Sequence, residues 1–82
     1  MKVKVSYTID LEEIPNKIRD IAKKNEETLL EISKLSESLA VGDLGAKSLQ
    51  NLTRMKELSE DLRERYSVCE SILTGFLRAM FS

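Results

Sequence analysis

Two long stretches of the sequence repeat apolar residues at intervals of three and four positions, and this spacing constrains the fold more than any other feature. In the first stretch these residues are Leu11, Ile14, Ile18, Ile21, Ile32, Leu35 and Leu39. In the second they are Leu52, Met55, Leu62, Tyr66, Cys69, Leu73, Phe76 and Met80. Steps of three and four place side chains on one face of an α-helix. The sequence therefore predicts one helix over residues 11–41 and another over residues 46–81.

Pro15 leaves two possible beginnings for the first helix, because a proline is tolerated only in the first turn. The helix begins either at Leu11, with Asp10 as its cap, or closer to Pro15. Between the two helices, residues 42–45 read Gly-Asp-Leu-Gly. We expect Gly42 to end the first helix in a left-handed conformation and Asp43 to cap the second. The 82 residues are expected to form a single domain, residues 1–82, built around an antiparallel helical hairpin.

The first ten residues follow a different pattern, in which apolar and polar residues alternate. The apolar positions are Val3, Val5, Tyr7 and Ile9, and the polar positions between them are Lys2, Lys4, Ser6 and Thr8. This alternation is typical of a β-strand with one buried face. No other stretch alternates in this way, and an unpaired strand leaves its backbone groups without hydrogen bonds. We therefore expect a strand over residues 1–10 that pairs antiparallel with the same strand of a second copy.

The predicted fold class is α+β, mostly α. It consists of an N-terminal β-strand followed by a long antiparallel helical hairpin, which dimerises into a four-helix bundle with an intermolecular two-stranded ribbon. The width of the apolar faces also favours a dimer. Residues outside the main stripes are Leu29 and Leu30 in the first helix and Leu58, Val68, Ile72 and Leu77 in the second. One facing helix cannot cover so wide a surface, so a homodimer or a dimer of dimers is expected.

Three polar residues interrupt the apolar stripes. Asn25 and Thr28 do so in the first helix and Ser59 in the second. If the hairpin places residue i beside roughly residue 85 − i, these three side chains meet in one polar layer. An asparagine on a helical interface is best known for fixing the alignment of the helices at some cost in stability. Replacement of Asn25 by leucine is therefore expected to raise stability and to loosen the register.

Residue types that carry enzyme chemistry are scarce. The sequence has no histidine, and its one cysteine, Cys69, lies on an apolar stripe where we expect a buried, unreactive thiol. The carboxylates of Glu57, Glu60, Asp61 and Glu64 alternate with basic residues. This pattern favours a solvated ion-pair face over a metal site. The sequence thus predicts no enzyme, with no catalytic, cofactor-binding or metal site and no cofactor.

Charge and cysteine content also restrict the partners. With 13 basic and 14 acidic residues the net charge is −1, which makes nucleic acid an unlikely partner. No stretch is apolar enough to span a membrane, and neither a targeting segment nor a pair of cysteines is seen, so a cytoplasmic location is expected.

The expected function is that of a non-enzymatic, homo-oligomeric interaction or scaffold protein. One alternative is a β-ribbon nucleic-acid-binding protein that uses Lys2, Lys4, Ser6 and Thr8. In its first ten residues the strand-helix-helix outline is similar to the ribbon-helix-helix families, whose paired strands enter the major groove of DNA. The helices here are roughly two to three times the ordinary length of about 11 residues, which disfavours that assignment. A second alternative is a small chaperone or an antitoxin-like protein that binds an unknown protein partner.

Overall fold

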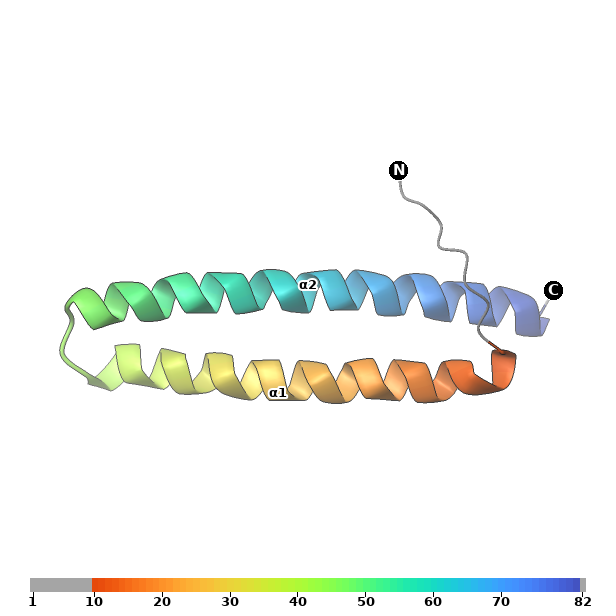
Figure 1. Ribbon diagram of the computed structural model, residues 1–82, viewed down its shortest axis with the longest axis horizontal. Helices are drawn as coiled ribbons and strands as arrows, with labels where there is room; N and C mark the ends of the chain where they lie inside the picture. Colours follow the sequence, from red (N-terminus) through yellow and green to blue (C-terminus); the bar gives the residue numbers. More distant parts are fainter. Residues whose placement is uncertain (1–9, 82) are drawn as a thin grey trace.

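The structure, a computed structural model, describes residues 10–81. Apart from Asp10 and the connection 42–45, every described residue is helical. A short 3₁₀ turn, Leu11–Glu13, leads into helix α1, Ile14–Val41, and helix α2 follows as Ala46–Phe81. The two helices lie side by side and antiparallel, joined at one end by residues 42–45 (Figure 1). The helical hairpin expected from the apolar spacing is confirmed.

The α+β fold class is wrong, because the described part of the chain contains helices and no strand. The expected strand covers residues 1–10. Residues 1–9, which include Val3, Val5, Tyr7 and Ile9 and the alternating Lys2, Lys4, Ser6 and Thr8, lie outside the described residues. A strand requires a paired edge, and the two helices offer none. The described residues therefore define an all-α hairpin.

The 3₁₀ turn explains why the sequence allowed two beginnings for the first helix. The Glu13 N–H donates a hydrogen bond to the Asp10 carbonyl oxygen at 2.8 Å, which closes the turn before α1 begins. Pro15 then lies in the first turn of α1. Its missing N–H costs nothing there, because the first N–H groups of a helix have no partner within that helix. The helical spiral thus starts at Leu11 and becomes an α-helix at Ile14.

The face of α1 that contacts α2 follows the predicted spacing. Its shielded residues are Ile14, Ile18, Ile21, Asn25, Thr28, Ile32, Leu35 and Leu39. On α2 the shielded residues are Ser48, Asn51, Met55, Leu58, Leu62, Arg65, Cys69, Ile72 and Phe76. We call these two faces together the hairpin interface. Within the described chain its buried apolar side chains are Ile14, Leu58 and Leu62.

The predicted stripe of α2 is only half right. Met55, Leu62, Cys69 and Phe76 lie in the hairpin interface as expected. The other four members, Leu52, Tyr66, Leu73 and Met80, are exposed, and the positions immediately before the first three, Asn51, Arg65 and Ile72, face α1 instead. Both sets repeat every seven residues, so spacing alone does not separate them. Tyr66 is more apolar than Arg65, which led the sequence prediction to the wrong set.

Gly42 ends α1 for a steric reason and not for a conformational one. Its φ of −95° and ψ of 173° are extended, so the predicted left-handed cap is wrong. A Cβ at this position would lie 2.8 Å from the Ser38 carbonyl oxygen, to which the Gly42 N–H donates a hydrogen bond of 2.9 Å. The predicted cap at Asp43 is also wrong, because it is the Ser48 hydroxyl that accepts a hydrogen bond from the Gly45 N–H, at 3.0 Å.

Two glycine substitutions should change stability in opposite directions. Gly42→Ala should lower the free energy of unfolding by roughly 1–3 kcal/mol, because the new Cβ is forced against backbone. Gly75→Ala should raise it by about 1 kcal/mol, because nothing lies within 4 Å of a Cβ there and alanine is the better helix former. Urea unfolding at one fixed protein concentration measures both. Equal effects of the two variants would contradict the steric role of Gly42.

Candidate functional site

A polar cluster crosses the hairpin interface near the middle of both helices. Arg65 of α2 donates from Nε to the Asn25 Oδ1 at 2.8 Å and from Nη2 to the Thr28 Oγ1 at 2.6 Å. The Thr28 hydroxyl in turn donates to the Lys24 carbonyl oxygen at 3.1 Å. Asn25 and Thr28 are buried, each with 6% of its surface exposed. The three side chains Asn25, Thr28 and Arg65 are called the polar cluster below.

The positively charged Arg65 donates its hydrogen bonds to neutral oxygens and not to a carboxylate. The ion pairs of residues 10–81 involve Arg54 and not Arg65. A partly buried guanidinium that loses water needs acceptors for its N–H groups, and here oxygens of Asn25 and Thr28 accept from two of them. A shift of one heptad in either direction would place Ile18 or Ile32 where Asn25 now lies. We therefore expect the polar cluster to favour this alignment of the hairpin over its neighbours.

The three residues of the predicted polar layer lie in different surroundings. The structure brings Asn25 and Thr28 together, but Ser59 is exposed and makes no side-chain hydrogen bond with another described residue. Sequence reasoning missed Arg65, which lies six positions beyond Ser59, the residue that was predicted to meet Asn25 and Thr28. A signal was present in the spacing, because Arg65 lies three and seven positions after the interface residues Leu62 and Leu58.

One flank of the hairpin interface is charged. The Arg54 Nε lies 3.2 Å from a carboxylate oxygen of Glu31 on the opposite helix, and its Nη1 lies 3.7 Å from a carboxylate oxygen of Glu57. About half of the Arg54 and Glu31 side-chain surfaces is exposed, so these pairs contribute little to stability. They nevertheless mark this side of the hairpin as one that faces water.

The other flank of α2 is apolar and uncovered. It follows a second run of three-four spacing, roughly 100° around the helix from the hairpin interface. Its apolar members are Leu49, Leu52, Tyr66, Leu73, Leu77 and Met80, whose exposed fractions range from 43% at Leu73 to 67% at Leu49. Its polar members are Lys56, Ser59, Arg63 and Glu70, all exposed. These ten residues are called the second stripe, and they form the candidate interaction surface.

An open, apolar groove lies beside the second stripe, at the N-terminal end of α1. It is lined by Ile14, Pro15, Ile18, Arg19, Leu73 and Phe76. Leu73 belongs both to this groove and to the second stripe. The uncovered apolar surface therefore extends from α2 across the edge of the hairpin interface to the first turns of α1.

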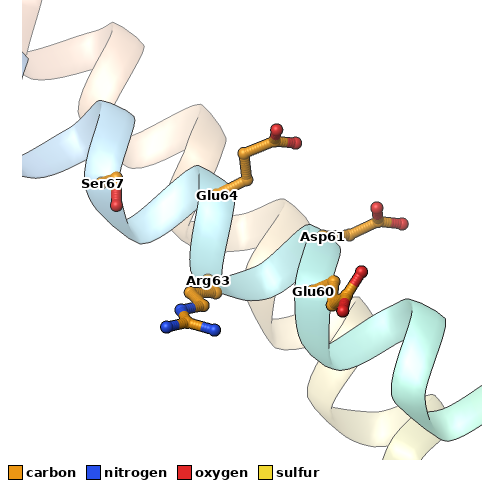
Figure 2. Close-up of a pocket in the computed structure, with 5 residues that line it drawn as sticks. All are labelled: Glu60, Asp61, Arg63, Glu64 and Ser67. Atoms are coloured by element: carbon orange, nitrogen blue, oxygen red, sulfur yellow. The ribbon is translucent and has the colours of Figure 1, made fainter.

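The acidic residues of α2 do not form a metal centre. Glu60, Asp61, Arg63, Glu64 and Ser67 line a shallow hollow on the outer surface, where the side chains of Asp61 and Glu64 point to one side and Arg63 to the other (Figure 2). Within the described residues, no three histidine, cysteine, aspartate or glutamate side chains are placed to bind a metal ion together. Cys69 is a free thiol and only partly buried, although the sequence predicted full burial.

Comparisons with known proteins add no assignment. No family model, no curated protein and no solved structure matches the chain. Neither helix of the described chain is long and apolar enough to cross a membrane. The geometry of the hairpin and of the second stripe is therefore the basis for a proposed function.

The polar cluster changes the expected result of removing Asn25. Asn25→Leu should lower the free energy of unfolding by about 1 kcal/mol, because it leaves the Arg65 Nε–H without an acceptor in a partly buried place. The double variant Asn25→Leu/Arg65→Leu should be at least as stable as the wild type, because the charge is removed together with its acceptor. Urea unfolding of the two variants measures the difference.

Asn51→Leu is the matched control, because Asn51 lies in the same interface and makes no side-chain hydrogen bond with another described residue. The change in helix propensity is the same, so this variant should unfold at an equal or higher urea concentration than the wild type. If Asn25→Leu were as stable as Asn51→Leu, the hydrogen bond to Arg65 would not hold the hairpin alignment.

Proposed function

We propose that this chain is a non-enzymatic interaction module that acts as a homodimer, in which two hairpins pack their second stripes together as a four-helix bundle. The observation that carries the proposal is the second stripe itself. It exposes six large apolar side chains on a helix whose other apolar face already contacts α1. Faces about 100° apart are what a helix presents to its two neighbours in a four-helix bundle.

The small core of the hairpin supports this proposal. Three apolar side chains of the described chain are buried, and all of them lie in the hairpin interface. The molecule is a rod with a longest dimension of 55 Å and a radius of gyration of 17.2 Å. A compact chain of this length would have a radius of gyration of about 12 Å. Small domains with so little core are commonly stabilised by association, which adds a second layer.

The composition of the chain and of its second stripe suits a protein interface. Tyr66, Met80 and the leucines of the second stripe are typical of interface cores, and the polar members of the stripe lie between its apolar ends. The net charge of −1 sets up little repulsion between copies. The absence of histidine from the sequence favours a role without catalysis.

A charge placed in the second stripe should dissociate the dimer. Light scattering after gel filtration should give the wild type a mass of twice the 9.3 kDa chain, whereas Leu73→Glu should give the mass of one chain. Burying a carboxylate against apolar surface costs several kcal/mol. If a dimer of micromolar affinity loses this much free energy of association, its dissociation constant rises far above the protein concentration and the two copies separate.

Ser71→Glu is the matched control, because it adds the same charge two positions away on an exposed face outside the second stripe. It should keep the mass of the wild type. Circular dichroism should show the same helical content in both variants, and Leu77→Glu serves in place of Leu73→Glu if that variant does not fold. A helical, monomeric wild type at micromolar concentration would contradict the proposed function.

A further inference from the structure

The apolar ends and the charges of the second stripe are placed symmetrically about Arg63, although Ser59 and Tyr66 differ in type and Met80 has no counterpart. Leu49 and Leu52 form an apolar patch toward the connection 42–45, and Leu73 and Leu77 form another toward the end of α2. Between these patches lie a positive charge at Lys56 and a negative charge at Glu70. Residue 63 is the midpoint between residues 49 and 77, and also between residues 56 and 70. This symmetry is what a surface needs to be complementary to itself across a two-fold axis.

We propose that the second stripe pairs antiparallel with the second stripe of another copy, with the two-fold axis at Arg63. This inference rests on the proposed function and adds the orientation and register of the two α2 helices. Leu49 then lies opposite Leu77 of the second copy, and the stripe residue nearest to Leu52 is Leu73, one position from the point directly opposite. Each of these contacts occurs twice, so both apolar patches are covered by apolar surface.

The charges of the second stripe agree with this register. Lys56 lies opposite Glu70 of the second copy, and the symmetry makes two such pairs. Arg63 meets its own equivalent at the axis, where Glu60 of each copy lies one turn away. In Figure 2 Arg63 points away from Asp61 and Glu64, with Glu60 between these two directions. The axis therefore collects two positive and two negative side chains, which offsets the repulsion of the arginines.

Two other pairings are less favourable. A parallel pairing places Lys56, Arg63 and Glu70 each against its own equivalent, so every charge meets a like charge. An antiparallel pairing shifted by one heptad, with the axis between Tyr66 and Ser67, brings Arg63 to Glu70. It also places Lys56 against Leu77 and leaves Leu49 without a partner. The pairing with its axis at Arg63 covers more apolar surface than the shifted pairing and, unlike the parallel pairing, places Lys56 against Glu70.

Disulfide cross-linking tests the register directly. In a Cys69→Ala background, copies with Leu52→Cys are mixed with copies with Leu73→Cys and then oxidised. Only cysteines whose Cα atoms lie about 4.4–6.8 Å apart form the bond readily. The mixture should give at least fivefold more covalent dimer on a non-reducing gel than Leu52→Cys alone. Efficient cross-linking of Leu52→Cys to itself would show a parallel pairing, and preferential cross-linking to Met80→Cys would show the shifted register. Either result would overturn the proposed register.

Charge reversal tests the same register without cysteine chemistry. Lys56→Glu and Glu70→Lys should each weaken dimerisation by roughly tenfold, because two attractive pairs become repulsive. The double variant Lys56→Glu/Glu70→Lys should recover most of the wild-type affinity. Glu64→Lys, on an exposed face outside the second stripe, is the control and should leave the affinity unchanged. The dissociation constants come from sedimentation equilibrium.

The outcomes separate this inference from the proposed function. A wild type that sediments as a monomer would contradict both. A wild-type dimer in which the double charge variant is no tighter than the single variants would contradict the register and leave the homodimer standing. A dimer with preferential cross-linking between positions 52 and 73 and with rescue by the double variant supports both.

Discussion

The structure depends on one polar contact, the hydrogen bonds from Arg65 to Asn25 and Thr28. The remaining residues of the hairpin interface are mostly leucine and isoleucine at regular spacing, and such residues pack acceptably in more than one alignment. A guanidinium is less tolerant, because its N–H groups require acceptors wherever it is shielded from water. Asn25 and Thr28 supply those acceptors at one position on α1. Moving the Arg65 guanidinium away from these acceptors would cost more free energy than moving any other side chain of the interface. We therefore infer that Arg65 selects the alignment of the two helices.

The exposed surface follows from this alignment. Once Arg65 faces α1, the next residue, Tyr66, must point roughly 100° away from it. Leu52 and Leu73 lie at heptad spacing from Tyr66 and are exposed on the same side. Helix α2 thus has two apolar faces and covers only one of them within its own chain. The polar cluster and the second stripe are coupled, because the side of α2 that faces α1 also determines which apolar residues of α2 are exposed.

Local patterns predicted the helices, and longer-range competition explains the errors. The apolar spacing and the glycines of residues 42–45 were sufficient for a helical hairpin, since both are properties of neighbouring residues. Whether Arg65 or Tyr66 faces α1 depends on Asn25, forty positions away in the sequence. A long charged side chain lies in an interface only where the opposite helix supplies hydrogen-bond acceptors for it. Asn25 and Thr28 were identified as a polar interruption, but Ser59 was assigned as their partner. The α+β class is wrong because it rested on a strand over residues 1–10, whereas the described residues 10–81 form helices alone.

The central claim is that the second stripe of one copy is covered by the second stripe of another. An isotope-filtered nuclear Overhauser measurement tests it most directly, in a sample that mixes equal amounts of methyl-labelled and unlabelled chains. Signals selected to cross between copies report only contacts made by the partner. The account predicts such signals between the Leu52 methyl groups of one copy and the Leu73 methyl groups of the other. The absence of any signal between copies, or signals that join Leu52 only to Leu52, would contradict it.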